Sequence, residues 1–204
     1  MRKVERTMNA IVTRKNQVVQ DPPVARFLFS DPRAAWLWLI VRLWLGYEWI
    51  DAGLHKLSNP AWTQTGEAVK GFWTNAIAIP EAGKPPISFD WYRTFLSTML
   101  EMEAYRFMAP LIAYGEVLIG IALVLGLFTG IAAFAGGLLN WNFMMAGTAS
   151  TNPVLFVLAI LLMLAWKVAG HIGLDRYVLP IVGTPWKNKP VAQAVPLVPA
   201  PSRA

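Results

Sequence analysis

Three long apolar segments follow one another in the second half of the chain, separated only by the short stretches GLFTG and TASTN. They cover Met108–Leu127, Thr129–Gly147 and Pro153–Gly170, and a fourth apolar segment, Ala34–Leu57, precedes them. A helix of about 20 apolar residues crosses the hydrocarbon core of a bilayer. The sequence therefore predicts an all-α fold, a polytopic membrane four-helix bundle whose second and third helices form a tight antiparallel hairpin.

The composition is typical of a membrane protein. Hydrophobic residues make up 55% of the 204 residues and charged residues only 15%, whereas soluble domains carry about 25% charge. The mean hydropathy is +0.42. The absence of cysteine excludes disulfides, thiolate metal sites and cysteine nucleophiles, and it leaves the redox compartment open. The net charge is +6, but basic residues concentrate at the two ends beside the apolar segments, so we expect no nucleic-acid partner.

Charge also predicts how the chain is organised around the membrane. Residues 1–33 form a basic arm, residues 181–204 form a proline-rich tail, and the loop 58–107 balances basic against acidic residues. Loops rich in Lys and Arg stay in the cytoplasm. We therefore expect a membrane domain over residues 34–180, both termini in the cytoplasm, and the loop on the outer side.

The loop between the first and second apolar segments has an internal pattern of its own. Apolar and aromatic residues recur on one helical face within Ala61–Ile77 and again within Phe89–Phe107, and PEAGKPP separates the two stretches. This predicts two short amphipathic helices on the outer surface, with aromatic side chains contacting membrane lipid at headgroup level. They could be a lid that only shields the bundle, or a roof over a site for a lipid-like ligand.

The first apolar segment carries ionisable residues in the stretch EWIDAGLHK, residues 48–56. At about 100° per residue, the polar positions of this helix separate into two stripes. One stripe holds Arg42, Gly46, Trp49, Gly53 and Lys56, and the other holds Trp44, Glu48, Asp51 and His55. Because ionisable groups facing lipid are costly, neighbouring helices or the loop must cover at least one stripe.

The first stripe contains the cation that lies deepest in the predicted membrane. From a rise of about 1.5 Å per residue, Arg42 falls close to the midplane, as do Glu116 on the second segment and Asn140 on the third. We expect Arg42 to pair with Glu116, with Asn140 nearby. This pair could be a buried ionic clamp that fixes helix register, or it could have a functional role.

The second stripe is a candidate for chemistry. Glu48, Asp51 and His55 lie toward the outer side, and carboxylates beside a histidine can pass protons. A quinone headgroup needs such donors and acceptors next to a flat wall, which Trp44 and Trp49 could provide. The alternative is a solvated helix end without a ligand.

The two histidines do not suit a resident metal cofactor. His55 lies near the predicted outer face and His171 near the inner face, so about 30 Å of hydrocarbon separates them. A bis-histidine haem is therefore not expected, nor are iron–sulfur or other metal sites, and no phosphate-binding loop or nucleophile motif is present. Quinone is the one redox ligand that the second stripe, with its neighbouring tryptophans, favours.

Three stretches resemble the DoxX/DoxD family of membrane proteins: RLWLGYEWIDAGLHKL, YGEVLIGIALVLGLFTG and AGHIGLDRYVLP. The resemblance covers about residues 34–180. It implies a multi-pass protein of a bacterial or archaeal cell membrane, linked to quinone redox chemistry. In members of the DoxD type, which have a similar long loop, the implied activity is oxidation of thiosulfate to tetrathionate with electrons passed to membrane quinone, together with a partner subunit.

The resemblance also implies which positions matter. Residues that match the family pattern are Arg42, Gly46, Gly53, Lys56, Glu116, Gly126, Thr129 and Asp175. We expect catalytic roles for Arg42, Lys56 and Glu116, and structural roles for Asn140, Asp175, Gly46 and Gly53. His55 is not part of the pattern.

Two hypotheses of function follow, and a third has less support. The first is a subunit of a quinone-linked oxidoreductase, with the thiosulfate:quinone type as the specific candidate, in which Lys56 attracts the thiosulfate dianion. The second is a non-catalytic accessory or assembly subunit of a larger membrane respiratory complex. A small transporter is the third, and the lack of a detectable internal repeat counts against it.

Overall fold

A computed structural model describes residues 11–12, 18–19 and 21–183 of the chain. Most of the predicted arm 1–33 and tail 181–204 therefore lies outside the described residues, and the predicted domain boundaries stay predictions. Two short strands, β1 (Ile11–Val12) and β2 (Val18–Val19), pair antiparallel. The rest of the described regular structure is helical, which confirms the predicted all-α class.

The helices follow the apolar and amphipathic segments of the sequence closely. Their bounds are α1 (Pro23–Ser30), the 3-10 turn η2 (Pro32–Ala34), α2 (Ala35–Leu57), α3 (Pro60–Thr63), α4 (Glu67–Ile77), α5 (Asp90–Glu101), α6 (Tyr105–Leu125), α7 (Thr129–Met145), α8 (Asn152–Leu164), α9 (Trp166–Ala169) and α10 (Asp175–Ile181). Two predicted segments are divided. Glu103, at a positive φ of 52°, separates α5 from α6, and the fourth apolar segment is interrupted at Ala165 between α8 and α9.

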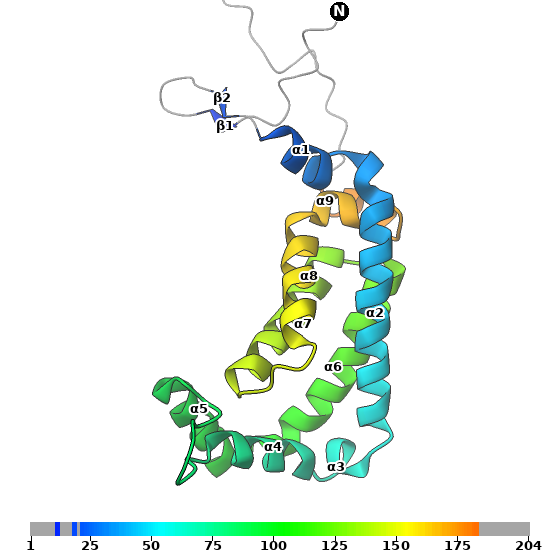
Figure 1. Ribbon diagram of the computed structural model, residues 1–204. Helices are drawn as coiled ribbons and strands as arrows, with labels where there is room; N and C mark the ends of the chain where they lie inside the picture. Colours follow the sequence, from blue (N-terminus) through cyan, green and yellow to red (C-terminus); the bar gives the residue numbers. More distant parts are fainter. Residues whose placement is uncertain (1–10, 13–17, 20, 184–204) are drawn as a thin grey trace, which may run out of the picture.

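Helices α2, α6, α7 and α8 run along the long axis of the molecule (Figure 1). The pairs α2–α6 and α7–α8 make the most extensive contacts, and the contacts between the two pairs are sparser. Glycines allow α2 and α6 to approach: a Cβ on Gly53 would lie 2.8 Å from the backbone nitrogen of Val117, and one on Gly46 would lie 2.9 Å from the carbonyl oxygen of Gly120. Small residues at helix interfaces favour this kind of close packing in membranes.

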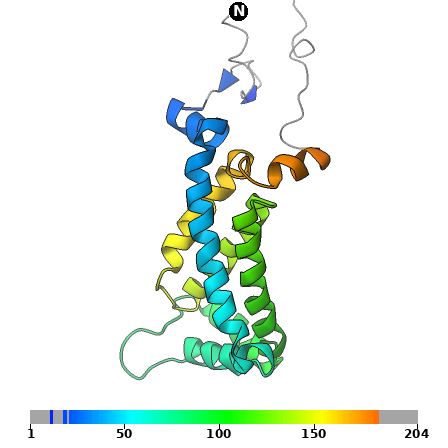
Figure 2. The same cartoon turned by 90° about the vertical axis from the view of Figure 1, so that its right-hand side faces the viewer.

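Short helices cover the two ends of the molecule. Helices α1, α9 and α10 lie at one end, which we call the α9 end, and α3, α4 and α5 lie at the other, the α4 end (Figures 1 and 2). The first and last described helices, α1 and α10, are thus on the same side. The predicted cytoplasmic position of that side stays a prediction.

Among the described residues, only α6 is both long and apolar enough to cross a membrane by length and composition. Helix α8 is apolar but shorter, with 13 residues. Helix α2 has 23 residues, and its ionisable side chains reduce its hydropathy. Passage of four helices through the bilayer therefore stays a prediction.

Candidate functional site

A buried ion pair lies between α2 and α6 near the α4 end. The Nζ atom of Lys56 donates to Oε2 of Glu116 at 2.6 Å, and it also lies 5.2 Å from the centroid of the Trp62 ring. The Glu116 side chain is 1% exposed and that of Lys56 is 20% exposed. A carboxylate this deeply buried needs a partner, and Lys56 provides the charge that compensates it.

The predicted pairing of Arg42 with Glu116 is wrong, and the helix register explains why. Gly46 faces Gly120 on α6, and Gly53 faces Val117. This antiparallel register brings Glu116 within reach of Lys56. It leaves Arg42 further along α2, about 21 Å from Lys56 at 1.5 Å per residue. Depths estimated along each helix separately do not show this register, because it depends on which turns of α2 and α6 face each other.

One carboxylate oxygen of Glu116 is unsatisfied. Its Oε1 atom is buried and has no hydrogen-bond partner within the described part of the chain. Leaving a buried polar group unpaired costs about 1–3 kcal/mol, and more for a charged group, so such atoms are rare in native structures. The Glu116 carboxylate therefore has a free position for a donor from a water molecule or a ligand.

The Lys56–Glu116 pair lines a cavity of about 340 Å³, which we call the Lys56 pocket. Its polar lining comes from α2, α6 and the link between α7 and α8, and its apolar lining includes four aromatic rings. The polar residues are Glu48, Lys56, Glu116, Thr148, Ser150, Thr151 and Asn152, and the aromatic residues are Trp49, Trp62, Phe72 and Phe143. Two carboxylates face one ammonium group, so the pocket is not a site for anions.

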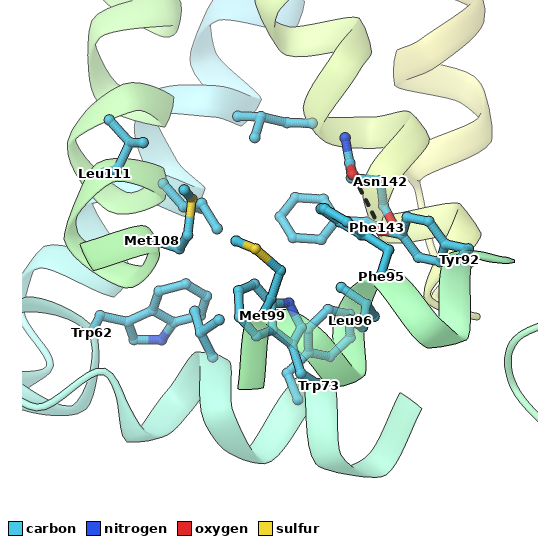
Figure 3. Close-up of a pocket in the computed structure, with 14 residues that line it drawn as sticks. Trp62, Trp73, Tyr92, Phe95, Leu96, Met99, Met108, Leu111, Asn142 and Phe143 are labelled. Carbon is cyan, nitrogen blue, oxygen red and sulfur yellow. Dashed lines mark hydrogen bonds between the residues drawn. The ribbon is translucent and has the colours of Figure 1, made fainter. Parts of the chain in front are cut away.

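A second cavity, the aromatic pocket, adjoins the first. It has a volume of about 230 Å³ and lies between α6 and the α5–α7 side, above α4 (Figure 3). Its lining residues are Trp62, Val69, Phe72, Trp73, Tyr92, Phe95, Leu96, Met99, Met108, Leu111, Ile112, Leu139, Asn142 and Phe143. Trp62, Phe72 and Phe143 line both pockets, so these three side chains form a shared wall.

Hydrogen bonds and ring contacts hold the aromatic pocket in shape. The rings of Phe72 and Phe143 meet edge to face, with centroids 6.2 Å apart. The Tyr92 hydroxyl donates to the Asn142 backbone carbonyl at 3.1 Å and lies 3.2 Å from its Oδ1 atom (Figure 3). Burial raises the pKa of Tyr92 to about 12, so the phenol stays protonated at neutral pH and remains a donor.

The structure divides the residues predicted to bind a quinone ring. Glu48 and Trp49 line the Lys56 pocket, and the indole of Trp49 packs on Gly136 of α7. Asp51 and His55 are instead exposed, at 52% and 78% of their side-chain surface, and their contact at 3.5 Å is local to α2. Trp44 is also exposed.

At least one stripe is covered, as predicted, and the stripe of Glu48, Asp51 and His55 is the more exposed one, since only Glu48 of these three lines a pocket. The other stripe is the covered one: Gly46 and Gly53 pack on α6, Trp49 packs on α7, and Lys56 contacts Glu116 of α6 and Trp62 of α3. The physical reason is that the glycines and Lys56 occupy the face of α2 that packs on α6.

Arg42 belongs to a separate cluster at the α9 end. Its Nη2 atom donates to the carbonyl of Ile172 at 2.7 Å and its Nη1 to that of Ala169 at 3.3 Å. A Cβ at Gly126 or Gly173 would collide with the guanidinium. Arg42 is thus used in packing against the segment between α9 and α10, far from the Lys56 pocket.

Asp175 and Asn140 also lie outside both pockets. The Asp175 carboxylate accepts hydrogen bonds from the backbone N–H groups of Phe128 and Thr129, and so it caps the N-terminus of α7. Asn140 is fully buried on α7, and among the described residues neither of its amide atoms has a hydrogen-bond partner. The expected cluster of Asn140 with Arg42 and Glu116 is not observed.

Sequence reasoning identified the loop aromatics as one helical face but missed two parts of the site. It assigned no role to Phe143, and it treated the hydroxyl-rich residues 148–151 only as a link between helices. Three hydroxyl side chains within TAST, next to an asparagine, were the available signal. Within the described ranges, no group of three or more His, Asp or Glu side chains could hold a metal ion.

Comparison with known proteins gives one match. A protein-family model described as DoxX matches residues 37–149. The curated proteins and the solved structures contain no match. The matched range includes α2, the loop helices, α6 and α7, and so contains both residues of the Lys56–Glu116 pair and the whole aromatic pocket.

Proposed function

Because the chain belongs to the DoxX family, a family of membrane proteins, we propose that it is a multi-pass subunit of a quinone-linked membrane oxidoreductase. In this proposal the quinone ring binds in the Lys56 pocket. The physiological electron donor is a reduced sulfur compound, as the resemblance to DoxD-type proteins implies, and it is oxidised by a partner subunit.

The apolar outer surface of the long helices supports a multi-pass arrangement. Large apolar side chains are exposed on all four of them: Trp36, Ile40, Leu43 and Tyr47 on α2; Tyr114, Leu118 and Ile121 on α6; Ile131, Phe134 and Leu138 on α7; Val154, Val157 and Leu164 on α8. Soluble monomers rarely expose contiguous apolar surface of this kind. We propose that the four helices cross the bilayer, with the α9 end in the cytoplasm and the α4 end outside.

The free Oε1 atom of Glu116 is the observation that carries the quinone proposal. A quinol hydroxyl can donate to this oxygen, and a quinone carbonyl can accept from Nζ of Lys56. Reduction of a quinone to a quinol takes up two electrons and two protons. In this proposal the partner subunit supplies the electrons and both protons come from the solvent side: Glu48, half-buried in the same pocket, relays each proton in turn to the Glu116 carboxylate, which passes it to a ring oxygen.

The charge of the Lys56 pocket argues against thiosulfate binding there. Lys56 is already paired, and Glu48 and Glu116 give the pocket an excess of negative charge. Two thiosulfate ions release two electrons on forming tetrathionate, which balances one quinone reduction. We propose that this oxidation occurs outside the pocket and that only the electrons reach the quinone.

Quinone affinity tests the proposal directly. The full chain in lipid nanodiscs is titrated with decylubiquinone, and binding is measured by quenching of tryptophan fluorescence. Glu116→Gln removes the charged acceptor and should weaken binding about tenfold or more. Glu81→Gln, the same change on an exposed loop residue, should leave affinity unchanged. Equal affinity of both variants and the wild type would remove Glu116 from a quinone site.

A non-catalytic accessory subunit is the second candidate. It is favoured by the closeness of the Lys56–Glu116 contact, because a complete ion pair can fix helix register without any ligand. The native complex purified in mild detergent distinguishes the two. If Glu116→Gln leaves its quinone reductase activity unchanged while the complex stays assembled, the accessory role holds.

A further inference from the structure

We infer that the aromatic pocket holds the isoprenoid tail of the quinone whose ring lies in the Lys56 pocket. The inference rests on the proposed function and specifies its substrate as a prenylated quinone rather than a small soluble one. Four observations support it: the chemistry of the lining, the three side chains that line both pockets, the exposed rim, and the sparse contact between α5 and α6.

The lining offers contacts for hydrocarbon and no site for a polar headgroup. The Tyr92 hydroxyl is already bonded to Asn142, and Nδ2 of Asn142 donates to the carbonyl of Leu138 at 2.8 Å. Aromatic and aliphatic side chains make up nearly all of the remaining surface. Met99 projects into the middle of the space, beside Met108 (Figure 3). Flexible thioethers adapt to irregular shapes, as a branched chain requires.

The two pockets adjoin through the wall of Trp62, Phe72 and Phe143. A ligand that passes beside these three side chains would place a polar ring beside Glu116 and a hydrocarbon chain beside Met99. Protein interiors are otherwise close-packed, and a cavity lined by apolar side chains favours an apolar occupant over water. The aromatic pocket, at about 230 Å³, is such a cavity. The division of polar and apolar lining matches a ring with a long tail.

The rim of the aromatic pocket lets a long chain leave sideways. Phe95 on α5 and Leu111 on α6 both line the pocket and are 46% and 50% exposed. Helix α5 packs on α4 and, through Trp91 and Tyr92, on α7, but its backbone makes few close contacts with α6, so the opening between Phe95 and Leu111 is not closed by helix packing. Leu111 continues into the exposed apolar surface of α6 through Tyr114 and Leu118. A tail that leaves here enters the region where we place the lipid.

Two probes with the same ring test the inference: ubiquinone-0, which has no tail, and ubiquinone-2, which carries a short isoprenoid tail. Each buried CH₂ contributes about fourfold in affinity, so the wild-type chain in nanodiscs should bind ubiquinone-2 at least about tenfold more tightly. Met99→Trp fills the pocket and should abolish this difference while affinity for ubiquinone-0 stays unchanged. Met102→Trp, on an exposed methionine of the same loop, is the matched control and should keep the difference.

A second variant keeps the test decisive if Met99→Trp does not fold. Leu111→Trp narrows the half-exposed rim at little cost to the core, and it should reduce the tail-dependent gain as Met99→Trp does. Retention of the full gain in both folded variants would overturn the inference. Equal affinity of the wild type for both probes, with Glu116→Gln weakening both, would also overturn it while leaving the proposed function intact.

Two further outcomes would also overturn the inference, each for a different reason. If neither probe binds, the proposed function and the inference fail together. If Met99→Trp leaves the tail preference intact but lowers the amount of phospholipid that co-purifies with the chain, measured by mass spectrometry, the pocket holds an acyl chain and the inference is wrong.

Discussion

Helix α2 carries two cations, the buried Arg42 toward the α9 end and the partly buried Lys56 at the α4 end, that are used in opposite ways. At the α9 end, Arg42 donates to the backbone carbonyls of Ala169 and Ile172 and is enclosed by glycines. At the α4 end, Lys56 pairs with a carboxylate that keeps a free oxygen beside a cavity. The Arg42 guanidinium is bonded to backbone carbonyls through both Nη atoms, while its Nε has no partner among the described residues, so its contacts serve the fold. A buried charge beside open space and an unpaired acceptor is available for a ligand.

The largest expected effect comes from the α9 end. Arg42→Met leaves the buried carbonyl of Ala169 and the part-buried carbonyl of Ile172 without their donor and should lower the free energy of unfolding by about 2–5 kcal/mol. Thermal unfolding in detergent micelles measures the change. The contrast between the two ends also requires that folded Arg42→Met retains its affinity for decylubiquinone. A selective loss of affinity with normal stability would place Arg42 in the quinone site instead.

The next effect belongs to the α4 end. Lys56→Met leaves the Glu116 carboxylate without its cation and should cost about 2–3 kcal/mol, less than at Arg42 because Lys56 is partly exposed. The double variant Lys56→Met, Glu116→Gln should recover part of this loss. A double-mutant cycle measures the coupling, expected at about 1–3 kcal/mol. Additive effects would mean that the pair contributes no interaction energy.

Gly53→Ala tests the register that chose the partner of Glu116. The new Cβ would lie 2.8 Å from the backbone of α6, so α2 and α6 must separate, and stability should fall by about 1–3 kcal/mol. Gly71→Ala on α4 is the matched control, because nothing lies within 4 Å of its Cβ position. That change should be neutral or stabilising by up to about 1 kcal/mol. Similar losses in both variants would contradict the close α2–α6 contact.

Tyr92→Phe should lower the free energy of unfolding by a smaller amount, about 0.5–1.5 kcal/mol, because the hydrogen bond to Asn142 is lost.

The ionisation of Tyr92 also makes the stability of the fold depend on pH. Its pKa is raised from 10.0 to about 12 in the folded chain, so the folded state keeps the proton that the unfolded state has lost. The contribution of Tyr92 to stability is therefore complete below about pH 10 and is lost as pH rises toward about 12. Tyrosinate absorbance of wild type and Tyr92→Phe measures this, and a Tyr92 phenol that ionises at its ordinary pKa would contradict it.

The smallest effects are expected on the exposed stripe of α2. Asp51→Asn and His55→Gln should change stability by less than about 0.5 kcal/mol, since both side chains are exposed and contact each other only locally. Decylubiquinone titration should give wild-type affinity for each. A clear loss of affinity would return these residues to the quinone site.

The sequence predicted more of the helices than of the site. The segment Ala34–Leu57 is observed as α2, Ala35–Leu57, because its apolar residues recur with helical periodicity and no proline interrupts it. The separation of its polar residues into two stripes also agrees with the structure: Arg42 is buried, while Asp51 and His55 are exposed. What failed was the choice of partner for Arg42, and the pattern did not show which segments would cover each stripe. Both depend on contacts between segments distant in the chain.

Composition and periodicity by themselves determined that this chain is helical, that apolar runs dominate its long helices, and which residues share a face of α2. These are local properties, fixed by hydrophobicity and by the geometry of one helix. Only the tertiary structure decided that Lys56 meets Glu116, that Arg42 binds backbone carbonyls, and that α4 and α5 enclose an aromatic pocket. The reason is physical: glycines on α2 and α6 set the register through close backbone contact, and a shift of one turn, about 5.4 Å, would give Glu116 different neighbours.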